Sequence, residues 1–176
     1  NRKGSHVATI IVLATHGVPP RDFPPAEMAE FFGLHARIEA GGHGMQPAQR
    51  ERYRALDDRM RAWPRTRAND PFHAASLEMA ERLSRKTGLE TIVGFNEFCG
   101  PSLDEAFASA AARGAGRVLV ITPMLTRGGE HAERDIPAAI VRARAAFPGV
   151  SFVYAWPFEG EAVLRLLTEQ VRRFTG

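Results

Sequence analysis

The sequence lacks several features that define whole classes of protein. Its single cysteine, Cys99, excludes an internal disulfide framework and a multi-cysteine zinc knuckle, and it fits a reducing compartment. The longest apolar run, near Ile10–Ala14, is far shorter than the roughly 20 residues that span a bilayer. The first residues, NRKGSH, lack the apolar segment of a secretory signal. We therefore expect a cytoplasmic protein that neither spans nor binds a membrane.

Motifs for nucleotide binding and serine nucleophiles are also missing. No strand is followed by GxGxxG, no P-loop lysine-serine pair is present, and no GxSxG motif occurs. These absences predict an activity that uses no nucleotide and no tightly bound cofactor.

Positive charge is concentrated in one part of the chain. The net charge is +3, and much of the excess lies in seven arginines: Arg50, Arg52, Arg54, Arg59, Arg61, Arg65 and Arg67. One interpretation is a solvated helix face, partly balanced by neighbouring acids; the other is attraction of a polyanionic ligand. Nucleic acid is not expected as a partner, because the run has few aromatic residues and no nucleic-acid motif.

The order of apolar runs and helical patterns predicts an α/β protein. With 176 residues and 44% hydrophobic content, the chain suits one domain, 1–176. Nearly continuous apolar runs predict strands that are covered on both faces, and helical patterns alternate with them. This alternation predicts a three-layer fold with a four-stranded parallel sheet and helices on both faces. The expected strands are Val7–Ala14, Thr91–Phe95, Arg117–Thr122 and Val150–Ala155. The expected helices are Phe72–Lys86, Ser102–Arg113, Arg134–Phe147 and Glu161–Phe174.

An insert at about 18–71 interrupts this alternation. It begins with PPRDFPP, whose prolines exclude a regular helix or central strand. A short helix, Ala26–Phe32, and an arginine-rich helix ending near Trp63 are expected further on. A connection of this length usually has a purpose. It could form a lid or binding wall, or a dimer-packing element, or it could be a decoration of this lineage.

Two histidines follow predicted strands and form the leading candidate site. His16 ends the first strand run, and His131 lies in GGEHAERDIP after the third. Ligands bind at the carboxyl edge of open α/β sheets, so we expect these imidazoles to lie within about 10 Å of each other. Neutral imidazole binds divalent metals and also accepts protons near neutral pH. An activity that depends on both roles should fall below about pH 6.

Other residues could assist the two histidines. Glu97, just past the second strand run, could accept protons or could simply cap a helix. Glu130 could share that role or lie on the surface. His35 and His43 of the insert could be further metal ligands, although histidines beside glycines more often lie in exposed turns. His73 is expected to cap or pack a helix, and Cys99 to be a small core residue rather than a soft metal ligand.

Three segments together resemble a known family. They are strand-His16-Gly17, then Phe95-x-Glu97-x-x-x-Pro101-Ser102-Leu103, then Gly128-Gly129-x-His131-x-x-x-Asp135-Ile136-Pro137. In order and spacing they resemble the CbiX/SirB sirohydrochlorin chelatases, which are class II chelatases related to the ferrochelatases. The chain departs from the family pattern in the long insert, in Gly17-Val18-Pro19-Pro20 and in Asn96.

The resemblance implies an activity and roles for particular residues. It implies insertion of a divalent ion (Co²⁺ or Fe²⁺ first, then Ni²⁺) into sirohydrochlorin or a related anionic tetrapyrrole, with the metal as a substrate. It assigns His16 and His131 as metal-binding and catalytic residues, with Glu97 assisting. Possible substrate contacts are Gly17, Leu125, Gly128 and Gly129. The main alternative is a metal or tetrapyrrole carrier without turnover, and a catalytically dead partner subunit is a weaker third.

The resemblance also bears on assembly. Members of the family occur as two-module chains or as one-module homodimers, and this chain carries one module. A homodimer is therefore expected, with apolar residues of the insert supplying uncovered surface: Phe31, Phe32, Leu34, Tyr53, Leu56, Met60 and Trp63. Alternatively, the insert folds back as the missing wall of a competent monomer.

Overall fold

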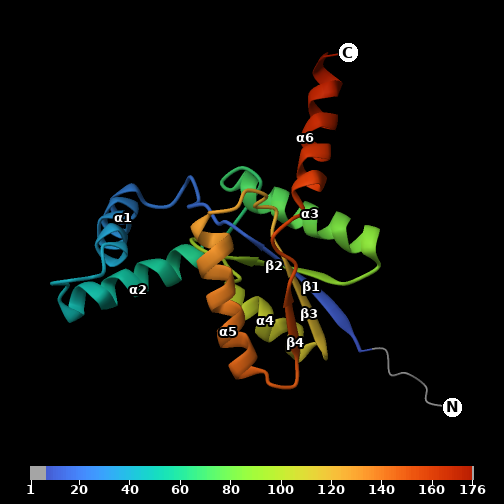
Figure 1. Cartoon of the computed structure of the whole chain (residues 1–176). Coiled ribbons are helices and arrows are strands. Elements are labelled where there is room, and N and C mark those ends of the chain that lie inside the picture. Colours follow the sequence, from blue (N-terminus) through green and yellow to red (C-terminus); the bar gives the residue numbers. More distant parts are fainter. Residues whose placement is uncertain (1–6, 176) are drawn as a thin grey trace.

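The centre of the molecule is a four-stranded parallel sheet (Figure 1). This computed structural model describes residues 7–175. The strands are β1 (Thr9–Thr15), β2 (Thr91–Phe95), β3 (Arg117–Ile121) and β4 (Ser151–Tyr154), and their order is β2-β1-β3-β4. All three pairings are parallel. The predicted strands are confirmed: β2 has the predicted bounds, and the ends of the other three differ from the prediction by at most two residues.

Helices cover both faces of the sheet, as the apolar character of the strands predicts. On one face α4 (Leu103–Ala112) and α5 (Ile136–Ala146) enclose the main core, which includes Val12, Val120 and Phe107. On the other face α3 (Pro71–Thr87) packs through Ala80 against a smaller cluster with Leu13. The three-layer α/β fold is therefore confirmed.

Local signals in the sequence explain where two of these helices begin and end. The predicted capping box of α4 is present, with the Ser102 hydroxyl accepting from the Glu105 N–H. Helix α3 begins after Asp70, whose side chain accepts from the His73 N–H, and ends at Gly88 in a left-handed conformation.

The insert forms two helices with a core of their own. Helix α1 (Pro25–Glu39) is longer than the predicted Ala26–Phe32, and α2 (Pro47–Arg61) is the predicted arginine-rich helix. Phe31, Leu56 and Met60 are each at most 1% exposed in the cluster between them. The expectation that these three side chains offer uncovered surface is therefore wrong, because α1 and α2 bury them against each other.

Most of the arginine run has partners inside the protein. Arg52 pairs with Glu30 at 2.7 Å and Arg59 with Glu27 at 2.5 Å, so α2 is tied to α1. Arg61 and Arg65 reach the loop after β2 instead. The solvated-face interpretation therefore covers only part of the run.

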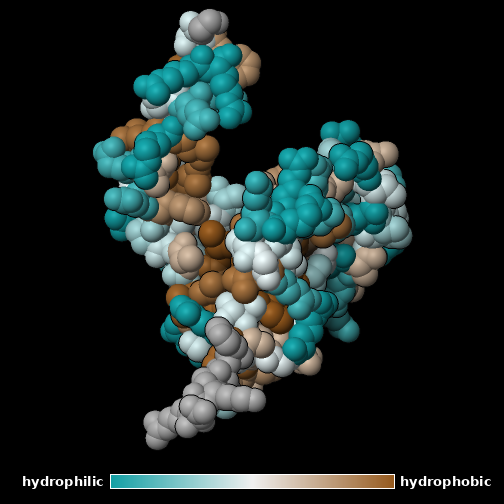
Figure 2. All heavy atoms as spheres, turned by 90° about the vertical axis from the view of Figure 1, so that its right-hand side faces the viewer, coloured by the Kyte–Doolittle hydropathy of each residue, from teal (hydrophilic) through white to brown (hydrophobic). Residues whose placement is uncertain are grey.

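The last helix, α6 (Gly160–Thr175), projects away from the sheet (Figure 1). None of its described residues is buried, and Leu164, Leu167, Val171 and Phe174 are 52–81% exposed. Figure 2 shows apolar side chains along one side of this helix and on the body below it. Among residues 7–175, no helix has the length and apolar content needed to cross a membrane.

Candidate metal site at the carboxyl edge of the sheet

Three strands deliver the candidate residues to one edge of the sheet. His16 directly follows β1, Glu97 lies just past β2, and His131 opens η1 (His131–Asp135), which follows the loop after β3. Parallel pairing aligns Thr15 with Phe95 and Leu13 with Ile121, so these strand ends share an edge. The fold thus brings together residues that are as much as 115 positions apart in the chain.

Glu97 bridges the two imidazoles. Its Oε1 lies 3.0 Å from His16 Nδ1, and its Oε2 lies 3.2 Å from His131 Nε2. The two imidazole rings meet edge to face, with centroids 4.6 Å apart. Each of the three residues offers one ligand atom, and these three atoms lie within 4.8 Å of one another. Within residues 7–175, this is the only such group of three metal-ligating side chains.

Asp135 fixes the orientation of His131. The residues between them form a π-helical turn, which places Asp135 Oδ2 2.6 Å from His131 Nδ1. The carboxylate accepts the Nδ1–H, so Nε2, which faces Glu97 at 3.2 Å, is the ring nitrogen whose lone pair can bind a metal or a proton. Burial opposes ionisation of Asp135, but hydrogen bonds from Arg134 and His131 outweigh it and lower the pKa of this carboxyl. In metal sites, a carboxylate often accepts the N–H of a metal-binding imidazole in this way and holds the ring in place.

A close approach of two backbones sets the distance between His16 and Glu97. A Cβ at Gly17 would lie 1.7 Å from the Glu97 carbonyl oxygen, so only glycine fits there. On the other side, the Cys99 N–H donates to the Glu97 carbonyl at 2.6 Å, and Phe98 between them has a φ of 55°. This left-handed conformation is uncommon for a residue with a bulky side chain and marks a tightly held turn.

The insert forms a wall beside the site. A cavity of about 350 Å³ lies between α1 and α2 of the insert and the residues around His131. Its lining includes His35, Tyr53 and Arg61 from the insert, together with Glu97, His131 and Asp135. The insert therefore lines one side of a cavity at the site, and its role as a binding wall stays a prediction.

The other candidate histidines lie outside the metal-ligating group. His35 Nδ1 is 3.0 Å from the Tyr53 hydroxyl and its ring stacks in the aromatic cluster of the insert. His43 is exposed in a turn between glycines, as its glycine neighbours predict. His73 stacks on Phe95, and burial lowers the pKa of its imidazole.

The remaining candidates divide between core and surface. Cys99 is fully buried, and burial raises the pKa of its thiol to about 11, which agrees with a core role. Glu130 is exposed and pairs with Arg134. Gly128 and Gly129 form an exposed turn before η1, Leu125 is half-buried, and Gly17 is buried at the site. Their contacts with a substrate stay predictions.

Sequence reasoning gave no role to three residues that shape the site. Asp135 is one position of the motif that contains His131, and its spacing of four from His131 is that of neighbours on one helix face. Arg61 and Arg65 looked like surface charge, and no local pattern distinguishes an arginine that binds distant carbonyls.

Two histidines and a carboxylate meet at the carboxyl edge of this α/β sheet, with a further carboxylate behind one of the histidines, and this set has the donor atoms that a divalent metal ion needs. The sequence model of the CbiX family matches residues 67–173, more than half of the chain. The chain belongs to the CbiX family.

Curated relatives carry chelatase names. A sirohydrochlorin ferrochelatase of Priestia megaterium is 30% identical over 80 residues, which are 45% of this chain and 30% of that protein. A sirohydrochlorin cobaltochelatase of Saccharolobus islandicus is 43% identical over 61 residues, or 35% of this chain and 46% of that protein. The matched segments thus span less than half the length of these relatives.

Two solved structures show partial similarity to this chain. The SirB protein of Bacillus subtilis with Fe³⁺ is 18% identical, with a TM-score of 0.49 over 96% of this chain and 48% of that one. A CbiX protein of Marinobacter aquaeolei is 20% identical, with a TM-score of 0.46 over 94% of this chain and 98% of that one.

Proposed function

We propose that this protein inserts a divalent metal ion, Co²⁺ or Fe²⁺ first and Ni²⁺ next, into sirohydrochlorin or a related anionic tetrapyrrole. The observation that carries this proposal is the meeting of His16, Glu97 and His131 at the carboxyl edge of the sheet. Membership of the CbiX family and the chelatase names of its relatives support it. The metal is a substrate, and no other cofactor is proposed.

The geometry suits the two tasks of metal insertion. Neutral imidazoles of His16 and His131 can replace water on the ion in stages, and His131 is held ready by Asp135. Two ring N–H protons must leave the macrocycle as the ion enters. Glu97, in contact with both imidazoles, can accept one of these protons and an imidazole that has released the metal can accept the other. The side chains of His16, His131 and Glu97 are 42%, 26% and 21% exposed, so a large planar substrate can reach them.

An absorbance assay tests the activity directly. Purified protein is mixed with sirohydrochlorin or protoporphyrin and with Co²⁺, Fe²⁺ or Ni²⁺, and the spectrum of the metallated ring is followed beyond one equivalent. We expect multiple turnovers with sirohydrochlorin and at least one of these ions. Insertion no faster than in the absence of protein, with every combination, would refute the proposal. Stoichiometric binding without turnover would instead favour the carrier.

We predict that His16→Ala and His131→Ala each lower the insertion rate by roughly 10²-fold or more, the range of a lost acid-base group. Neither side chain belongs to a core cluster, so circular dichroism and thermal unfolding should change little. His43→Ala, an exposed histidine outside the site, is the matched control and should retain the rate of the unaltered protein. Normal rates in both site variants would reject their assigned roles.

We further propose a homodimer in which α6 packs on a second copy of this chain. An isolated helix of 16 residues is marginal in water, so the apolar stripe of α6 needs a covering surface. The same chain offers one, because Leu119, Ile121 and Val153 lie half-buried on the sheet face opposite α4 and α5. A second copy brings both surfaces at once, which suits a symmetric, reciprocal contact. We also propose a cytoplasmic location. Its only support is that the single cysteine, Cys99, is free.

A further inference from the structure

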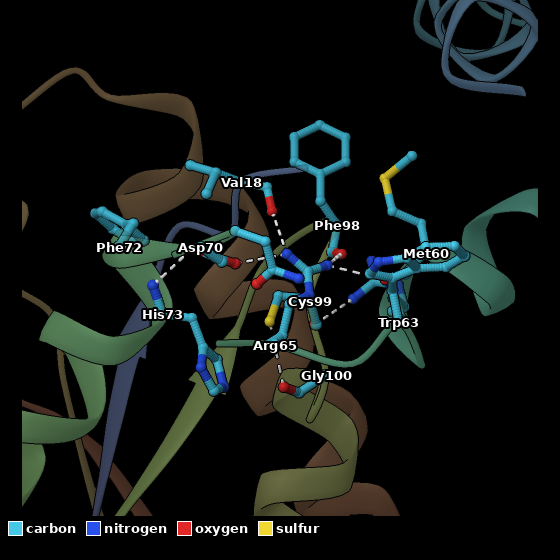
Figure 3. Close-up of polar contacts among 12 residues, drawn as sticks. Val18, Met60, Trp63, Arg65, Asp70, Phe72, His73, Phe98, Cys99 and Gly100 are labelled. Carbon is cyan, nitrogen blue, oxygen red and sulfur yellow. Dashed lines mark hydrogen bonds and ion pairs between the residues drawn. The ribbon is translucent and has the colours of Figure 1, made fainter. Parts of the chain in front are cut away.

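Arg65 of the insert is a buried cation surrounded by backbone carbonyls (Figure 3). Its side chain is 5% exposed. Nη1 donates to the Val18 carbonyl at 2.7 Å and to Asp70 Oδ2 at 2.5 Å. Nη2 donates to the Met60 carbonyl at 2.9 Å and to the Phe98 carbonyl at 2.5 Å. A guanidinium can hold this many partners at once because its donors are fixed in a planar fork.

These partners belong to the two loops that carry the metal site. Val18 lies two residues after His16, and Phe98 directly follows Glu97. Arg65 therefore joins two loops through one side chain: the loop after β1, which carries His16, and the loop after β2, which carries Glu97. Its other partners, Met60 near the end of α2 and Asp70 at the start of α3, anchor it to the insert and to the sheet-covering helix.

The loop after β2 needs such an anchor. Phe98 has a positive φ, a conformation that persists only where surrounding contacts enforce it. The carbonyl of this same residue receives the 2.5 Å bond from Arg65 Nη2. Arg61 supports the loop from a second direction, with Nη1 donating to the Cys99 carbonyl at 3.2 Å. Two cations supplied by the insert thus hold the turn that carries Glu97.

Asp70 makes burial of this cation possible. Its side chain is 1% exposed, and while Oδ2 accepts from Arg65, Oδ1 accepts from the His73 N–H at the start of α3. The carboxylate thereby neutralises Arg65 and caps the helix at once. A lysine at position 65 could keep the ion pair with Asp70, but a single ammonium cannot reproduce the fork that spans both loops.

We propose that Arg65 is a positioning residue that sets the separation of His16 and Glu97, and that the insert is thereby a structural part of the metal site. This inference rests on the proposed function, since it concerns the same three ligands. It assigns the insert a purpose beyond that of a wall: without its arginine, the carbonyls of Val18 and Phe98 would lose the donor that they share.

The test measures Co²⁺ binding to the full chain, without tetrapyrrole, by calorimetry and by visible absorption of the bound ion. Arg65→Met and Arg65→Lys are compared with Phe107→Leu, a core variant beneath the opposite sheet face that lowers stability and leaves these loops alone. All proteins are measured well below their unfolding midpoints. We expect Arg65→Met to weaken Co²⁺ affinity about tenfold or more, the usual effect of losing a group that orients the metal-binding side chains. Arg65→Lys should fall between it and the unaltered protein, and Phe107→Leu should bind normally.

The outcomes separate this inference from the proposed function. If the unaltered protein binds no Co²⁺, the proposed metal site itself is wrong. If it binds Co²⁺ and folded Arg65→Met binds equally well, or if Phe107→Leu loses as much affinity, the positioning role is overturned. Should Arg65→Met fail to fold, Arg65→Lys decides, and unchanged affinity and spectrum in that variant would overturn the role. Recovery of Co²⁺ affinity in Arg65→Ala on adding guanidinium, but not sodium chloride, would support it.

Discussion

Gly17 shows how a single residue without a side chain can control the site. The backbone of the His16 loop passes so close to the Glu97 carbonyl that a Cβ would lie 1.7 Å from its oxygen. We predict that Gly17→Ala destabilises the fold by about 1–3 kcal/mol, the range for overpacking, and also weakens Co²⁺ binding because the two loops must separate. Chemical denaturation and Co²⁺ titration measure the two effects. Stability and affinity that both match the unaltered protein would show that the loops relax without cost.

The lowered pKa of Asp135 predicts how the stability of the protein changes with pH. Because the pKa of this carboxyl is lowered in the folded state, its contribution to stability is complete above the usual aspartate range and is lost as pH falls through the folded-state pKa. In Asp135→Asn, the stability deficit should therefore be largest near neutral pH and should shrink on acidification. Urea unfolding from about pH 7 to about pH 3 measures it. A deficit that does not vary with pH would contradict the assigned ionisation.

At the scale of elements, the insert is built from helices that tolerate change on their outer faces. Gly33 is exposed within α1, and a Cβ there would meet no atom within 4 Å. Gly33→Ala should stabilise the protein by about 0.5–1 kcal/mol, because alanine loses less conformational freedom in a helix. Thermal unfolding measures the gain, and the contrast with Gly17→Ala separates the effect of space from that of adding a methyl group. A loss of stability would indicate an unrecognised contact of α1.

At the scale of the whole molecule, α6 exposes an apolar surface that no other part of the described chain covers. Its apolar stripe is exposed in one copy, and the half-buried sheet face lies on the same chain (Figure 2). We predict a dimer in sedimentation at micromolar concentration, and we expect Leu167→Asp with Val171→Asp to shift it to a monomer near 19.3 kDa. Arg165→Asp, which places the same side chain toward the polar side of α6, should leave the dimer intact. A single monomeric species of the unaltered chain that still inserts metal would refute the dimer and leave the insert as the replacement wall.

Much of the architecture follows from the sequence alone. Continuous apolar runs in β1 and β3, the Ser102–Glu105 capping box and Gly88 are local signals, because strand burial and helix ends depend on residues within a few positions. The parallel order then places His16, Glu97 and His131 at one edge. Their proximity was predictable because carboxyl ends of neighbouring parallel strands coincide. Their roles, and the description of the chain as one domain with an insert, stay predictions.

Only the tertiary structure decided how the site is held together. Arg65 and Asp135 act through groups that the sequence pattern does not connect: carbonyls of Val18 and Phe98, and an imidazole met through a π-helical turn. The same holds for burial, since Phe31 and Leu56 look like available surface until α1 and α2 pack together. Amphipathic patterns say that a face needs cover, but they do not say what covers it. The sequence therefore determines which residues meet at the sheet edge, while long-range packing determines how rigidly they are positioned and which apolar surface remains.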